Sequence, residues 1–286
     1  MKVDKFRTVI IYIIIILLGL VCLLPLLNIV AISFSSSAAV EGNMVGLIPV
    51  GFSTAAYEKI LEDSQFWHSF LISVERVVLT LIINFVLIVL MAYPLSKTNA
   101  QFRGRNIYAN LMIFAMLFNG GMIPTFLLVK SYGLLNTVWA LVLPGAVPIF
   151  NVILVMNFFA AVPKELEEAA FIDGANPLQV LTKIFIPISK PVLATVSLFS
   201  IVGSWNDFYS GLIYMSKAAY YPLMTYIQSL QINVEDLIKQ GNLSAVVDSA
   251  SLGNTNLNAA KIVVAVIPLL LIYPLLQRYF VSGIVV

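Results

Sequence analysis

Residue types that commonly perform chemistry are scarce in this 286-residue sequence, and they form no catalytic or metal-binding pattern. The chain has one histidine, His68, and one cysteine, Cys22, so neither a His-rich metal site nor a disulfide framework can form. His68 follows Trp67 at the edge of an apolar stretch, which favours an interfacial position over a ligand role. No G-x-x-x-x-G-K-[ST] phosphate loop occurs. We therefore expect no catalytic residue, no metal and no bound cofactor on this chain.

The acids that do cluster are suited to contacting another protein. Glu165, Glu167 and Glu168 directly follow Pro163. A proline is tolerated in the first turn of a helix, and acids there complement the helix dipole, so a helix is predicted to begin at this point. The small residues Ala169 and Ala170 come next and would let a second surface approach closely.

Gly174 then interrupts this helix, and Asn176-Pro177 supplies a second cap and first turn. A second short helix is predicted from Pro177 to Ile186-Pro187, which should break it. Residues 161–189 are therefore predicted to form a helix, a turn and a helix. Periodicity alone leaves two interpretations open, a docking site for a protein and a hairpin lying on a membrane surface.

The composition of the whole chain indicates which structural elements position these residues. Hydrophobic residues make up 60% of the chain and charged residues 10%, whereas soluble domains average about 45–50% and about 25%. Uncharged stretches of roughly 18–20 residues or more cross a bilayer core, and in lipid only helices or closed barrels satisfy the backbone. Since strand-like alternation is absent, we predict an all-α polytopic membrane protein with six transmembrane helices, at 9–33, 69–95, 107–130, 137–160, 190–214 and 260–283.

Basic residues orient these spans, because Lys and Arg concentrate on the cytoplasmic side. Placing both termini in the cytoplasm puts most of them inside: Lys2, Lys5, Arg7, Lys97, Arg103, Arg105, Lys164, Lys183, Lys190 and Arg278. Residues 1–68 then hold the cytoplasmic N-terminal end, the first span and an outer loop. Residues 69–283 form the main transmembrane domain, with 161–189 inside and 215–259 outside. A net charge of +2 without a basic run argues against a nucleic-acid partner.

Polar residues at membrane depth are candidates for a transport route, because they are costly in lipid. Asp207 lies near the outer end of the fifth predicted span, beside Trp205, Asn206 and Tyr209. The two rings either anchor the span at the interface or line a sugar route. Glu75-Arg76 in the second span should meet partners on other helices. Four asparagines are more consistent with hydrogen bonds between helices than with substrate contact: Asn84, Asn119, Asn151 and Asn157.

The run EEAAFIDGANPLQVLTKIFIP resembles the EAA loop of binding-protein-dependent ABC importer permeases. The matching positions are Glu168-Ala169-Ala170, Gly174, Ile184 and Ile186-Pro187, with Ile186 where the family usually has Leu. Asp173, Ala175 and Pro191 are similar to the carbohydrate branch, which includes maltose permease. Residues 119–159 and 204–215 resemble permeases for complex polysaccharides and aldouronates.

This resemblance implies a type I ABC importer permease fold in a bacterial cytoplasmic membrane. The implied partners are a homologous second permease, two ATPase subunits that bind ATP and Mg²⁺, an external solute-binding protein and an oligosaccharide. The implied coupling residues are Glu168, Ala169, Ala170, Asp173 and Gly174. In relatives the segment equivalent to 215–259 can reach the binding protein, which makes Gln228, Gln231 and Asn233 candidate contacts. The alternative is import of a solute that is not a sugar, because the loop motif indicates coupling to an ATPase and does not indicate which solute is transported.

Overall fold

The computed structural model describes residues 4–118, 120–230 and 255–283, and these contain helices but no β-strand. Contacts divide the chain into two compact units, which we describe separately. One consists of residues 1–67 and 226–267, and the other of residues 68–225 and 268–286. The sequence-based division placed all of 69–283 in one domain, whereas the contacts group 226–267 with the N-terminal part.

The first unit contains α1 (Asp4–Ser33), α2 (Ser37–Glu41), α3 (Ala55–Glu62) and the beginning of α16 (Thr255–Gly283). In α1 every side chain from residue 7 to residue 27 is exposed, although the segment is almost entirely apolar. A helix that is apolar all round needs an apolar environment, which here is lipid or another membrane helix. The start of α16 is fixed by Asn256, whose Nδ2 donates to the carbonyl oxygen of Ser35 at 3.2 Å.

A polar cluster joins distant segments of this unit through Asp63. Its Oδ2 accepts hydrogen bonds from the Lys261 ammonium at 2.7 Å and the Tyr226 hydroxyl at 2.9 Å. Its Oδ1 accepts from the backbone N–H of Phe66 at 2.9 Å. Burial alone would raise the pKa of Asp63, but these hydrogen bonds and the Lys261 charge outweigh it and lower that pKa. Burial and Asp63 raise the pKa of Tyr226, which therefore remains a protonated donor.

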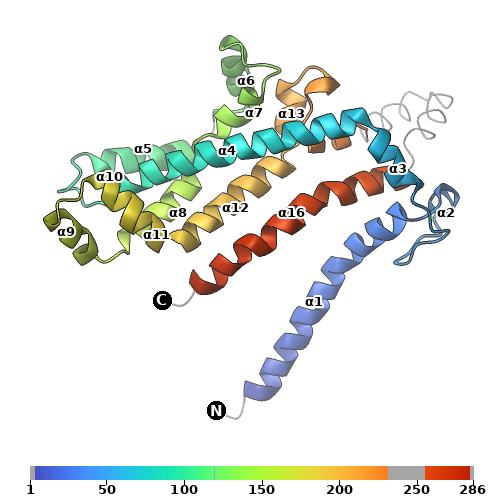
Figure 1. The fold of residues 1–286 in the computed structure, drawn as a ribbon, viewed down its shortest axis with the longest axis horizontal. Coiled ribbons are helices and arrows are strands. Elements are labelled where there is room, and N and C mark those ends of the chain that lie inside the picture. Colours follow the sequence, from blue (N-terminus) through green and yellow to red (C-terminus); the bar gives the residue numbers. More distant parts are fainter. Residues whose placement is uncertain (1–3, 119, 231–254, 284–286) are drawn as a thin grey trace. The chain divides into compact units, whose positions relative to one another are not determined.

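The second unit is built along α4 (Ser64–Ser96), which packs with α8 (Ile149–Ala160) and α12 (Lys190–Asn206). Their shared apolar core consists of buried residues from all three helices and from the 161–189 loop. Among its members are Ile88, Val89, Ala92, Val152, Val155, Phe159, Val180, Leu181, Phe185, Leu193 and Val196. Figure 1 shows α9 (Lys164–Ile172) and α10 (Pro177–Val180) of that loop beside the carboxyl end of α4, and α13 (Tyr209–Tyr214) near its amino-terminal half.

Two predicted spans are bent where glycine and proline occur. The expected helix 107–130 consists of α5 (Arg105–Leu117) and α6 (Met122–Ser131), which differ in direction by 110°. Gly121 between them has φ +94°, a conformation that favours glycine. The expected helix 137–160 consists of α7 (Val138–Val142), a 3₁₀ turn (η1, Leu143–Gly145) and α8, with a 47° bend. Pro144 and Pro148 lack the N–H groups that a continuous helix needs.

The fifth predicted span, 190–214, is wrong as one helix. α12 ends at Asn206, and α13 (Tyr209–Tyr214) begins after Asp207, whose Oδ1 accepts from the Ser210 N–H at 3.1 Å. The apolar helical segment that continues α12 is at its amino-terminal end instead. Residues 177–188 precede α12 and meet it at an 84° bend. Within the described residues, three helices can cross a bilayer by length and composition, and the number reaches six if each bent pair is one span.

Candidate functional site

The loop between α8 and α12 forms the predicted helix, turn and helix. α9 (Lys164–Ile172) begins after Pro163, and Gly174 ends it with φ +81°. The N–H of Ala175 donates to the carbonyl oxygen of Ala170 at 2.9 Å across this turn. α10 (Pro177–Val180) is capped by Asn176, whose side chain and that of Gln179 each accept from the other's backbone N–H.

Helical structure continues beyond the predicted break at Pro187. A π-helical turn (η2, Leu181–Phe185) leads into α11 (Ile186–Ile188). In a regular α-helix the proline ring would clash with the carbonyl of residue 183, and the wider π turn relieves this contact. The direction change occurs at Ser189, where α12 follows.

The predicted coupling residues lie on one accessible surface. Glu168, Ala169, Asp173 and Gly174 are exposed, and Ala170 is half-buried against the apolar core. Three of the five predicted residues border a hollow of about 510 Å³ between α9 and the helix that follows. Its lining consists of Ala170, Asp173, Gly174, Ala175, Gln179, Val180, Lys183 and Ile184. The loop therefore presents small residues around a concave surface, which another protein's side chains can enter.

Glu167, which sequence reasoning did not single out, holds α9 against the end of α4. Its carboxylate lies 2.7 Å from the Lys97 ammonium and accepts a hydrogen bond from the Tyr93 hydroxyl at 3.4 Å. The Lys97 ammonium also lies 4.1 Å and 4.3 Å from the ring centres of Tyr93 and Phe185. Burial lowers the pKa of Lys97, and Glu167 acts in the opposite direction. Helical spacing could have found this residue, because Glu167 is three positions from Ala170 and shares its inward face.

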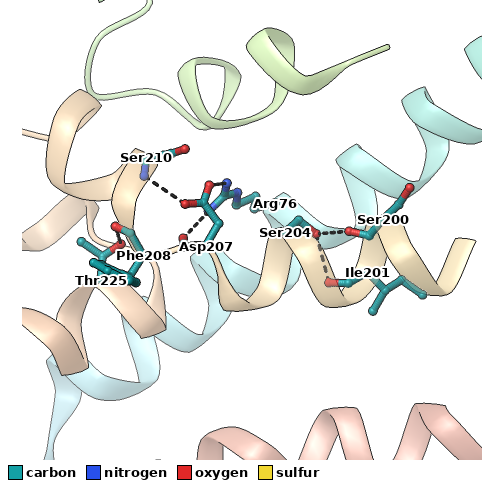
Figure 2. A network of polar contacts seen from close by, with 8 residues as sticks. All are labelled: Arg76, Ser200, Ile201, Ser204, Asp207, Phe208, Ser210 and Thr225. Carbon is teal, nitrogen blue, oxygen red and sulfur yellow. Dashed lines mark hydrogen bonds and ion pairs between the residues drawn. The ribbon is translucent and has the colours of Figure 1, made fainter. Parts of the chain in front are cut away.

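A second site is a cavity of about 270 Å³ between α4, α12 and the η1 region, with both polar and apolar lining residues. Arg76, Thr80 and Asn84 of α4 line it, together with Asn151, Ser200, Ser204, Asp207, Ser210 and Tyr214 among others. Figure 2 shows the Asp207 carboxylate between the Arg76 guanidinium and the Ser210 N–H. Arg76 Nη1 also donates to the Asp207 carbonyl oxygen at 2.9 Å. This ion pair connects α4 to the end of α12, as expected for Arg76.

The predicted route residues separate in the structure, and Asp207 is the one of the four that lines this cavity. Trp205 is 4% exposed and packs edge-on against Phe70. Asn206 is exposed, and so is Tyr209, whose hydroxyl lies 3.0 Å from the Met122 sulfur. The sequence signal that could have found the cavity is the four-residue spacing of Arg76, Thr80 and Asn84.

The predicted asparagine bonds are present in part. Asn84 Nδ2 donates to Ser200 Oγ at 3.1 Å and so links α4 to α12. Asn151 is buried in the cavity wall, Asn157 is exposed, and Asn119 lies outside the described residues. Of the predicted binding-protein contacts, Gln228 is half-buried in a helix over 223–230, and Gln231 and Asn233 lie outside the described residues.

Comparison with known proteins places this arrangement in a family. A model described as the binding-protein-dependent transport system inner membrane component matches residues 2–286. The chain belongs to this family. It is therefore the permease component of an ABC transporter, with the all-α fold predicted from the sequence.

Relatives of this permease are known in sequence and in structure. It is similar to Protein LplC of Bacillus subtilis (strain 168), with 39% identity over 94% of this chain and 89% of LplC. The polygalacturonan/rhamnogalacturonan transport system permease protein YtcP of the same strain is 38% identical over 98% of this chain and 96% of YtcP. A crystal structure of a bacterial ABC transporter involved in the import of the acidic polysaccharide alginate matches with a TM-score of 0.85 and 32% identity, covering 98% of both chains.

Proposed function

We propose that this permease moves an oligosaccharide, derived from a polysaccharide and containing uronate units, from an external binding protein into the cytoplasm. Two relatives support this cargo, since one is named for polygalacturonan and rhamnogalacturonan and the other for alginate. The cavity beside α4 combines apolar surface with polar side chains, a lining that suits a sugar. Import of a solute that is not a sugar is the less supported alternative.

The proposed transport mechanism is based on one observation, the exposed helix, turn and helix formed by α9 and α10. We call this segment the α9–α10 hairpin. Its small residues and concave surface suit the insertion of both helices into a cleft on an ATPase subunit. Glu168 would contact that subunit, Ala169 and Ala170 would permit close approach, and Asp173 and Gly174 would form the turn. ATP and Mg²⁺ bind the partner ATPase subunits, and movement of the hairpin switches the spans between inward-open and outward-open states.

The complete importer in this proposal contains a homologous second permease, two ATPase subunits and the solute-binding protein. Both termini of this chain and the hairpin lie in the cytoplasm. The outer segment 215–259 contacts the binding protein, with Gln228, Gln231 and Asn233 as candidate residues. The basic residues predicted to be inside support this orientation, because Lys97 and Lys183 lie at the hairpin.

Reconstitution of the whole importer tests the proposal. We expect ATP hydrolysis in proteoliposomes to rise when binding protein loaded with trigalacturonate is added on the outer side, and labelled sugar to accumulate inside. A matched preparation carries Glu168→Lys, which reverses the charge on an exposed surface without changing a span. It should insert normally but lose the sugar-dependent rise. Equal stimulation of both preparations would contradict the coupling role, and absence of uptake in the wild type would contradict the cargo.

A further inference from the structure

An apolar groove of about 430 Å³ lies within the second unit, between the carboxyl end of α4, α5 and the start of α8. Apolar and aromatic residues line it throughout. Leu95 is 4% exposed and Met91 packs against the apolar core, so these two residues form the inner wall. Leu90, Tyr108 and Leu111 are more than half exposed, so the groove is open to the outside. We call it the α4–α5 groove.

The α4–α5 groove has a positive charge at one end. Tyr108, Met112 and Ala115 of α5 line the groove and follow one another at helical spacing. Arg105 is three residues before Tyr108 and begins the same face. Its Nε donates to the Leu95 carbonyl oxygen at 3.0 Å, which holds the guanidinium beside the groove. Figure 1 shows α5 beside the carboxyl-terminal part of α4. The ten residues from Arg105 to Ala115 provide about 15 Å of apolar wall behind this charge.

No carboxylate in the described part of the chain neutralises this end of the groove. Arg103 is exposed in the turn before α5, and neither Arg103 nor Arg105 belongs to an ion pair there. Residues 76–164 contain no Asp or Glu. Glu167 of α9 already pairs with Lys97. Two guanidinium groups at the end of an apolar groove are therefore left for an anion from outside the chain.

The hydrogen-bonding capacity of Arg105 identifies the kind of anion. Its guanidinium has five N–H groups, and two of them donate within the chain, to the Leu95 carbonyl oxygen and to Asn106 Oδ1. Three remain, and a guanidinium binds phosphate oxygens through paired hydrogen bonds. A phospholipid joins a phosphate to long apolar chains. Since the two arginines carry uncancelled charge, a headgroup of net negative charge fits better than a zwitterionic one.

We propose that the α4–α5 groove binds one anionic phospholipid from the leaflet on the side of the α9–α10 hairpin. One acyl chain lies along Met112 and Ala115, the phosphate accepts hydrogen bonds from Arg105, and Arg103 adds a second positive charge. The hairpin is on this side because Glu167 of α9 contacts the residue after α4. The site concerns the lipid environment of the permease and does not depend on which solute is transported.

Photolabelling of the complete importer tests the charged end of the site. The importer is reconstituted in phosphatidylcholine vesicles with a trace of phosphatidylglycerol that carries a photoactivatable group on one acyl chain. We expect the label on residues 90–95 and 108–115. Arg103→Gln should lower it about fivefold and Arg103→Gln/Arg105→Gln about 25-fold, as for the loss of one and two basic residues at a membrane surface. Lys130→Gln is the matched control, because Lys130 is exposed in the last turn of α6 and does not line the groove.

Two outcomes of this experiment would overturn the proposal. Equal labelling of the double variant and of Lys130→Gln would show that the arginines do not hold the lipid. The same photoactivatable group on phosphatidylcholine should label these residues at least about fivefold less. Equal labelling by the two lipids would indicate ordinary contact with the bilayer and no site for an anionic headgroup.

A change of shape tests the apolar part of the groove independently of charge. Ala115→Trp places a large ring in the groove and should remove most of the phosphatidylglycerol label from residues 90–95, on the opposite wall. Ile113→Trp is the matched control, because Ile113 is 47% exposed on the same helix and does not line the groove. Equal labelling of the two variants, measured per inserted molecule, would contradict occupation by an acyl chain. Absence of label from both walls in the wild type would show that another subunit covers the groove, and it would also overturn the proposal.

Discussion

The Lys97 ammonium and the Glu167 carboxylate lie 2.7 Å apart, and both side chains are nearly buried. This contact joins α9 to the residue directly after α4. Glu168, the next residue, points to solvent. Two adjacent acids of one motif therefore have different environments, and different consequences are expected when each is replaced.

Glu167→Ala should destabilise the permease by about 3 kcal/mol, because it leaves Lys97 as a buried charge without its carboxylate. Glu168→Ala should change stability by less than about 0.5 kcal/mol, as for an exposed side chain. Thermal unfolding of the purified protein measures both effects. The double variant Glu167→Ala/Lys97→Met should recover most of the loss, and strict additivity of the two single changes would contradict the pairing.

Gly174→Val should disrupt the turn between α9 and α10. Glycine adopts φ +81° freely there, whereas a β-branched residue is strained by about 1–3 kcal/mol. Nothing lies within 4 Å of an added Cβ, so the cost arises from the backbone and not from a clash. Gly174→Asn is the control, because asparagine tolerates this conformation better. The measurement is sugar-stimulated ATP hydrolysis, and equal losses in both variants would show that the strain is not the cause.

The Asp63 cluster should be stable at neutral pH and fail only in acid. The pKa of Asp63 lies below its ordinary value of 3.8 in the folded protein. A carboxyl with a depressed pKa stabilises the fold fully above its unfolded pKa, and the contribution is lost as pH falls through the lower folded value. The difference in Tm between the wild type and Asp63→Asn should thus stay constant from about pH 8 to about pH 5 and shrink below 3.8. A difference that already shrinks near pH 6 would contradict this assignment.

Trp205→Ala should reduce the amount of folded protein and leave the concentration dependence of uptake unchanged. The ring is 4% exposed and packs against Phe70, so its removal leaves a cavity that costs about 3–5 kcal/mol. Uptake is measured per inserted molecule over a range of trigalacturonate concentrations. If the variant inserts normally but needs a higher trigalacturonate concentration for half-maximal uptake, Trp205 lines the transport route instead.

Local sequence signals predicted the helix, turn and helix within residues 161–189, but they did not predict the contacts between distant helices. Pro163, Gly174 and the Asn176-Pro177 pair determine backbone geometry within a few residues, so the helix, turn and helix could be located from sequence alone. The Arg76–Asp207 pair spans 131 positions of sequence, and no local pattern reports which helix an arginine will meet.

The bent spans were missed for a related reason. A hydropathy average counts the apolar residues in a window and does not report the direction of the helix axis. It therefore merged α12 with α13 across Asp207. α12 ends because Asp207 has an extended backbone, and the bond from the Ser210 N–H to Asp207 Oδ1 caps the start of α13. One polar residue in an apolar window hardly changes the average hydropathy.

α4 connects the loop containing α9 to the cavity. The Tyr93 hydroxyl donates a hydrogen bond to Glu167 of α9, and Arg76 lines the cavity. The helix is continuous between them, but Pro94 has no N–H to donate to the Leu90 carbonyl, so the turn that contains Tyr93 lacks one helical hydrogen bond. From Arg76 to Leu90 the helix is regular and about 21 Å long. A rotation imposed at Tyr93 would pass through this weakened turn before it reached Arg76, so that the end of α4 beside α9 can bend without turning the cavity wall.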